Sequence, residues 1–147
     1  MWWRKKKNKG PLVPDRTALN NMAVKVVAEA KLNFDSAAPL EQALVGTFLF
    51  GMIYAYCAQR KMTPPEVHAL ALIVFVDSLH YTEQAAAEGV QNCINASKPG
   101  YHDTMNTILH RGIDAHRQYE AGDFTGLGEN IRSVLSHFKK RERLTIR

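Results

Sequence analysis

The most apolar run of the chain, from Leu44 to Ala58, constrains the fold more than any other feature. It covers 15 residues, and only Thr47 and the tyrosines Tyr54 and Tyr56 bring polar groups into it. A helix that spans a membrane needs about 20 apolar residues, so this run is too short. We therefore predict a helix buried inside the protein, as the central element of the fold.

Helical periodicity governs the rest of the chain, and no alternation of apolar and polar residues lasts beyond a few positions. We expect helices over residues 15–33, 39–61, 63–81, 82–97, 102–121 and 123–138. The fourth is either a separate helix or an extension of the third after a kink at Tyr81 and Thr82. The sequence thus predicts an all-α fold, a single domain of five or six helices in bundle-like or orthogonal packing.

Two helix starts carry explicit signals. Asp15 can cap the first helix through its side chain. In "TPPE", Thr63 stands at the N-cap, two prolines follow where a missing N–H costs nothing, and Glu66 lies three residues on, as a capping box requires. The apolar faces behind these starts repeat every three or four residues. In the first helix this face comprises Leu19, Met22, Val26, Ala30 and Val27, and in the last Leu127, Ile131, Val134, Leu135 and Phe138.

The net charge of +5 is concentrated at the two ends of the chain. "RKKKNK" at 4–9 holds five basic residues, and 139–147 holds five more against one acid, which leaves 9 basic and 13 acidic residues in 10–138. We predict a basic, disordered tail over 1–14, a mildly acidic helical domain over 15–138 and a basic tail over 139–147. Only the tails could bind phosphate, and without sequence specificity, so no specific nucleic acid is expected as a partner.

The N-terminal "MWWRKKKNKGP" is not typical of a signal peptide, because Gly10, Pro11 and Pro14 follow the charges where an apolar stretch would be needed. We expect a cytoplasmic protein without a transmembrane segment. Tryptophans beside lysines leave open a weak contact of this tail with an anionic membrane surface. Cys57 and Cys93 lie in apolar periodic segments, which favours buried, reduced thiols.

The stretch "HDTMNTILHRGIDAHRQ" at 102–118 holds three of the six histidines. On a helix, its apolar positions, with Gly112, share one face, and the polar ones form a stripe. Gly112 would let a neighbouring helix approach closely. His110 and Asp114, four residues apart, could act as metal ligands or as an acid–base pair. The simpler interpretation is a recognition and packing helix, with His116 buried and hydrogen-bonded.

A second polar pair, Asp77 and His80 in "DSLH", has the spacing of half a carboxylate-bundle metal site. No second HxxxD or ExxH motif occurs elsewhere in the sequence to complete a four-ligand site. We therefore predict no metal and no other cofactor, and a metal-binding helical-bundle enzyme that uses His110, Asp114, Asp77 and His80 stays an alternative. Asp77 is expected at the end of a buried helix, paired with an arginine. No nucleophile motif such as GxSxG occurs either.

Three segments of the chain are "TPPEVHALALIVFVDSLHY", "INASKPGYH" and "TMNTILHRGIDAH". Together they resemble the immunity protein 48 family, all-α immunity proteins of bacterial polymorphic toxin systems. The resemblance covers Asp15 to Phe138 and leaves out both tails. It implies a non-catalytic protein that binds a cognate toxin in the cytoplasm and blocks it by direct contact. A mildly acidic body agrees with such a role, because toxins that attack nucleic acid tend to be basic.

Helix geometry, and not the family, selects the polar residues that we expect at the contact with the toxin. They are Glu66, Asp77, His80, Asn106, His110, Arg111 and Asp114. An ion pair between Asp77 and Arg111 inside the protein is the alternative for those two. Besides the enzyme, a helical adaptor or regulatory module stays open as a function, and would expose an apolar groove or form an oligomer. The sequence does not define the oligomeric state.

Overall fold

The structure is a computed structural model that describes residues 12–146, with side chains through residue 138. In this part of the chain there are six α-helices, one short 3-10 helix and no strand. They are α2 (Leu12–Ala30), η1 (Phe34–Ser36), α3 (Pro39–Gln59), α4 (Pro64–Asp77), α5 (Glu83–Ala96), α6 (Asp103–Glu120) and α7 (Phe124–Ile146). The all-α, single-domain prediction is confirmed.

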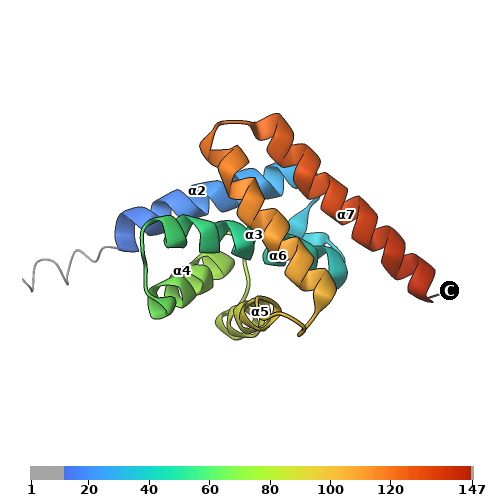
Figure 1. The fold of residues 1–147 in the computed structure, drawn as a ribbon, viewed down its shortest axis with the longest axis horizontal. Coiled ribbons are helices and arrows are strands. Elements are labelled where there is room, and N and C mark those ends of the chain that lie inside the picture. Colours follow the sequence, from blue (N-terminus) through green and yellow to red (C-terminus); the bar gives the residue numbers. More distant parts are fainter. Residues whose placement is uncertain (1–11, 147) are drawn as a thin grey trace, which may run out of the picture.

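Helix α3 lies at the centre, and the other helices pack around it (Figure 1). It is the one helix among the described residues that is long and apolar enough to cross a membrane, and 72% of its most apolar window is buried inside the protein. Phe48, Leu49 and Ile53 have no exposed surface at all. The apolar run thus forms the core helix that we predicted.

The crossing of α3 and α6 brings two backbones into direct contact. A methyl group on Gly51 would overlap the carbonyl oxygen of Leu109. One on Gly112 would overlap the carbonyl oxygen of Phe48 and lie 3.2 Å from the Cα of Gly51. Only a residue without a side chain fits at either position, so the two glycines set the distance between the helices. The prediction that Gly112 permits a close approach is confirmed.

Helix α4 begins as its sequence predicts. Thr63 Oγ1 accepts a hydrogen bond from the backbone N–H of Glu66 at 3.4 Å, and the Glu66 carboxylate accepts one from the backbone N–H of Thr63 at 2.9 Å. The helix ends at Asp77, four residues earlier than expected, because the chain turns through a left-handed conformation at His80. Thr82 then caps α5, which is therefore a separate helix.

Helix α2 differs from its prediction at both ends. It already includes residues 12–14, so Asp15 lies in its first turn and not at its cap. The Asp15 carboxylate instead accepts a hydrogen bond from the hydroxyl of Tyr56 at 2.7 Å, which ties α2 to α3. The helix ends at Ala30 because Lys31 is left-handed, with a φ of 55°.

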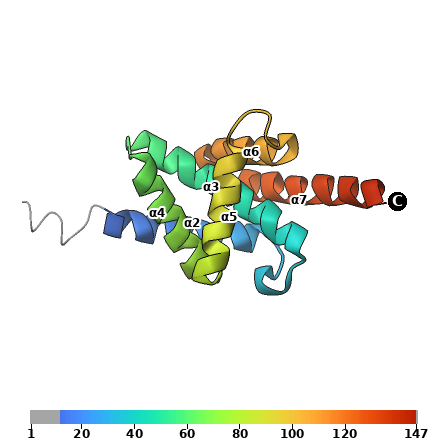
Figure 2. The same ribbon diagram turned by 90° about the horizontal axis from the view of Figure 1, so that it is seen from below.

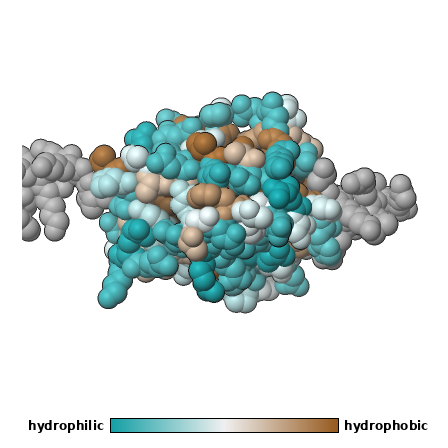
Figure 3. Space-filling view, turned by 90° about the horizontal axis from the view of Figure 1, so that it is seen from above, coloured by the Kyte–Doolittle hydropathy of each residue, from teal (hydrophilic) through white to brown (hydrophobic). Residues whose placement is uncertain are grey.

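The two predicted tails are only partly within the described residues. Residues 1–11 of the N-terminal one lie outside them. At the other end, the backbone of α7 stays helical through Ile146, and this last part of the helix extends beyond the other helices (Figure 2). The face opposite α5 is mostly hydrophilic, with small apolar patches between polar residues (Figure 3).

Candidate functional site

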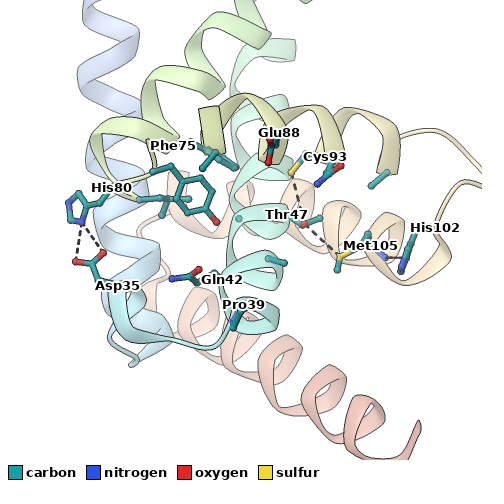
Figure 4. Close-up of a pocket in the computed structure, with 18 of the residues that line it drawn as sticks. Asp35, Pro39, Gln42, Thr47, Phe75, His80, Glu88, Cys93, His102 and Met105 are labelled. Atoms are coloured by element: carbon teal, nitrogen blue, oxygen red, sulfur yellow. Dashed lines mark hydrogen bonds and ion pairs between the residues drawn. The ribbon is translucent and has the colours of Figure 1, made fainter. Parts of the chain in front are cut away.

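A groove lies between α3 and α5 (Figure 4). It encloses about 760 Å³, within the range of sites that bind small molecules or partner side chains. We call it the α3–α5 groove. Along α3 its lining residues are Pro39, Gln42, Ala43, Gly46 and Thr47, and along α5 they are Ala85, Glu88, Gly89, Asn92, Cys93 and Ala96. Asp35, Phe75, Leu79, His80, Tyr81, Tyr101, His102 and Met105 close the remaining walls.

The floor of the groove is apolar and aromatic. The rings of Phe75 and Tyr81 meet edge to face, with centroids 5.5 Å apart. Gly89 lets α5 come close to them, since a methyl group there would lie 3.3 Å from the Tyr81 ring. Burial in this wall raises the pKa of the Tyr81 hydroxyl, so it stays a neutral phenol. The floor is therefore suited to the apolar part of a ligand.

A chain of sulfur contacts crosses the middle of the groove. The hydroxyl of Thr47 lies 3.7 Å from the sulfur of Met105 and 4.0 Å from that of Cys93 (Figure 4). Burial raises the pKa of the Cys93 thiol to about 12, against a lowering by the Thr47 hydroxyl. The thiol is therefore protonated and unreactive at neutral pH. Both cysteines are free and buried, as predicted.

One end of the groove is formed by Asp35 and His80. The imidazole Nδ1 of His80 lies 3.0 Å from Oδ1 and 3.2 Å from Oδ2 of Asp35, and both side chains are 63% exposed. His80 has a φ of 62°, a conformation that costs a residue other than glycine about 1 kcal/mol or more. Such strain is common at functional sites, and here the imidazole of the strained residue lies against Asp35 (Figure 4).

The rim of the groove carries negative charge. Asp35 stands before α3 and Glu88 on the opposite wall, on α5 (Figure 4). Glu88 accepts one long hydrogen bond, at 3.5 Å, from the amide of Gln84. Among the described residues that line the groove there is no lysine or arginine. The α3–α5 groove thus combines an aromatic floor with carboxylates that are open to solvent.

Two smaller depressions lie elsewhere. Between α6 and α7, a cleft is lined by charges of both signs, Arg111 and Arg117 among carboxylates such as Asp114 and Glu129. Next to the start of α4, an apolar pocket is lined mainly by Phe50, Tyr54, Met62, Val67 and Ile94. This pocket is an exposed apolar groove of the kind that the adaptor alternative calls for.

The seven predicted contact residues do not form one surface. Arg111 and Asp114 line the cleft between α6 and α7, and only His80 lines the α3–α5 groove. Glu66 is used by the cap of α4, as described above. Asn106 donates a hydrogen bond to the carbonyl oxygen of Ala96 at 2.9 Å and so ties α6 to the end of α5. These two therefore have structural roles.

The alternative of an ion pair between Asp77 and Arg111 is wrong. Asp77 ends α4 and pairs with Arg16 of α2, whose Nη2 lies 2.8 Å from its Oδ2. Asn20 of α2 donates to the same oxygen at 3.1 Å. Arg111 donates to the side-chain oxygen of Asn130 on α7 at 2.9 Å. The expected arginine partner of Asp77 exists, but it comes from the first helix.

The residues of the metal alternative are also separated. Asp77 faces α2 and His80 faces Asp35, while Nδ1 of His110 lies 2.8 Å from the carbonyl oxygen of Asn106 instead of pairing with Asp114. No group of three His, Cys, Asp or Glu side chains that could hold a metal ion occurs among the described residues. The proposed ligands therefore do not converge on one ion.

His116 lies in the core, as predicted, and its partner is Glu120 on the same helix. Nε2 of His116 lies 3.1 Å from Oε1 of Glu120, a poorly aligned contact for a hydrogen bond, and Nε2 has no other partner among the described residues. The ring meets Tyr56 edge to face. Burial lowers the pKa of His116 more than the charge of Glu120 raises it, so the imidazole is neutral at pH 7.

The groove residues that sequence reasoning missed belong to three separate segments. Asp35 stands in η1, Glu88 and Asn92 on α5, and Tyr101 before α6. No motif connects them in the sequence. The one available signal was Tyr101, an aromatic residue in "KPGYH" that stays 60% exposed. Exposed tyrosines of this kind are enriched in protein interfaces.

Fold and site together define a small all-α protein with a ready-made concave binding surface. The chain belongs to the immunity protein 48 family, whose model matches residues 17–139. The match extends from α2 to the end of the described side chains of α7 and so confirms the resemblance seen in the sequence. Families of this kind are generally non-enzymatic and act on toxins. Comparison with curated proteins and with solved structures finds no match.

Proposed function

We propose that this protein binds a cognate bacterial toxin in the cytoplasm and neutralises it by direct contact, with no catalysis of its own. The observation that carries the proposal is the extent of the family match, residues 17–139. It includes all the helices that build the core and every residue of the α3–α5 groove. The family property therefore applies to the whole folded body and not to a fragment of it.

The charge of the body supports the same proposal. Residues 10–138 carry 9 basic and 13 acidic residues, and the carboxylates at the groove face solvent. An acidic surface accelerates the encounter with a basic protein and orients it. A toxin that acts on nucleic acid presents such a basic surface.

The test is co-expression of the full chain with the toxin domain encoded beside its gene. We expect the chain to restore growth of bacteria that the toxin alone kills. Calorimetry with a catalytically inactive toxin should show a 1:1 complex with a Kd of about 10 nM or below. Killing that continues at equal expression, together with no measurable complex, would overturn the proposal. Metal analysis of the same sample adds a control, because stoichiometric transition metal would favour the enzyme alternative.

A further inference from the structure

We infer that the α3–α5 groove receives an arginine side chain of the toxin, and this inference rests on the proposed function. The groove has the two parts that such a side chain needs. The partly exposed ring of Tyr81, backed by the buried ring of Phe75, offers an aromatic surface to its methylene stem, and Asp35 and Glu88 offer carboxylates to its guanidinium group.

Charge distinguishes the α3–α5 groove from the two other depressions described above. In the cleft between α6 and α7, Arg111 and Arg117 stand among the carboxylates of Asp114, Asp123 and Glu129, so an entering cation also meets charges of its own sign. The apolar pocket beside α4 has Lys61 and His68 on its walls and no carboxylate. In the α3–α5 groove, no lysine or arginine stands among the described lining residues. A cation entering the groove therefore meets only attraction from the fully charged side chains.

The carboxylates of the groove are available because the protein does not need them. Asp35 pairs only with the exposed His80, and exposed ion pairs of this kind contribute about 1 kcal/mol or less to stability. Glu88 has a single 3.5 Å hydrogen bond from a neighbouring residue on its own helix. By contrast, Glu66 is part of the cap of α4, and Asp77 forms an ion pair with Arg16. The groove carboxylates can therefore bind a partner at little cost to the stability of the fold.

Arginine fits this site better than lysine. Its guanidinium group is planar, stacks on aromatic rings and binds carboxylates through two parallel hydrogen bonds, whereas the ammonium group of lysine is a strongly hydrated point charge. Tyr81 lines the floor and Tyr101, 60% exposed, stands at the rim. An arginine that stacks on one of these rings would be desolvated there in a way typical of interface hot spots.

The first experiment tests the chemistry of the groove without the toxin. Benzamidine, an aromatic amidinium, is titrated into the 15N-labelled full chain at pH 7.5, and neutral benzamide is titrated as its isostere. We expect shifts at groove residues such as Gly89, and binding of benzamidine about tenfold tighter than that of benzamide. Equal binding of the two, or shifts confined to the other depressions, would overturn the inference.

Matched variants test separately the charge of the groove and the space inside it. The pair Asp35→Asn and Glu88→Gln should abolish the preference for benzamidine, whereas Glu83→Gln with Glu129→Gln removes as much charge outside the groove and should leave it intact. Ala85→Trp fills the groove, while Ala87→Trp puts the same bulk on an exposed position of α5 that does not line it. Only Ala85→Trp should block the binding of both benzamidine and benzamide. An equal effect of variant and control would contradict the groove as the site.

The second experiment measures the toxin itself against the same variants. We expect Asp35→Asn with Glu88→Gln, and also Ala85→Trp, to weaken the complex at least about tenfold relative to their controls. If the toxin binds the wild-type chain and these variants equally well, the proposed function stands and the groove inference fails. If benzamidine selects the groove but the toxin does not bind, the proposed function fails instead.

A second copy of the chain is the competing occupant, because its ends are basic. Analytical ultracentrifugation of the wild type and of Ala85→Trp over a range of concentrations distinguishes the two. We expect both to sediment as the same species. Self-association that Ala85→Trp abolishes, and Ala87→Trp does not, would assign the groove to the second copy and overturn the inference.

Discussion

The α3–α6 crossing and the α3–α5 groove are built on the same helix in opposite ways. At the crossing, Gly51 and Gly112 let two backbones touch, and a single methyl group has no room. At the groove, α3 and α5 leave about 760 Å³ between them, and a methyl group on Gly46 would lie 3.6 Å from the Phe75 ring, an ordinary contact. One region of α3 holds the fold together, and the other is left open for binding.

The largest change in stability is expected from one of two glycine substitutions on α3. Gly51→Ala should destabilise the protein by about 2–3 kcal/mol, because the new methyl group must push α6 away. Gly46→Ala should change the free energy of unfolding by less than about 1 kcal/mol, and the higher helix propensity of alanine favours stabilisation. Urea denaturation measures both. Equal stabilities would mean that the crossing is no tighter than the groove.

A smaller effect concerns how α5 is held as a wall of the groove. Asn106→Ala removes the hydrogen bond to the Ala96 carbonyl oxygen and should cost about 1 kcal/mol. It should also speed amide hydrogen exchange near the end of α5 more than in α3. The control is Gln91→Ala on the exposed face of α5, for which we expect a change within about 0.5 kcal/mol. Unchanged exchange in α5 would show that this wall is held by packing alone.

In the tightly packed part of the molecule, acidification should lower the free energy of unfolding because of His116. Because burial lowers its pKa in the folded state, the unfolded chain binds a proton first as the pH falls below about 6.5. The stability that the neutral imidazole contributes is therefore complete above that pH and is lost on acidification. Urea midpoints between pH 7.5 and 5 should fall more steeply for the wild type than for His116→Gln. The same pH dependence in the wild type and in His116→Gln would show that His116 is not the cause of the loss.

The smallest effect is expected in the groove itself. Asp35→Asn and Glu88→Gln, alone or together, should change the free energy of unfolding by less than about 0.5 kcal/mol, since both side chains are exposed and weakly bound. Thermal denaturation followed by circular dichroism checks this. A loss above about 1 kcal/mol would show that the carboxylates serve the fold, and the contrast between the two regions would no longer hold.

Local signals predicted the tightly packed region well. The apolar run around Leu49, the cap formed by Thr63 and Glu66, and the small residue Gly112 all have a physical meaning that can be read within one helical segment. Each of them was confirmed. The first helix was harder, because the carboxylate of Asp15 had two uses, as an N-cap or as the acceptor for Tyr56, and its partner lies 41 residues further along the chain.

The groove could not be predicted in the same way. Its rim joins Asp35, Glu88 and Tyr101 from three segments, and nothing in their spacing shows that the segments meet. The polar stripe on α6 was visible in the sequence, but it directed attention to His110 and Asp114, which do not line the groove. Likewise, the partner of Asp77 depended on how α2 lies against α4, and helix patterns do not define such packing.

The backbone contact at Gly51 and Gly112 has a consequence for how a protein of this kind can diversify. The contact uses no side chain, so exchanges at the mouth of the groove do not disturb the axis on which α3 and α6 cross. Substitutions at positions 35, 85, 88 and 101 can therefore change the chemistry of the groove while the contact between the two helices stays as it is. The surface that we propose for recognition is thus separate from the contact that holds the two helices together.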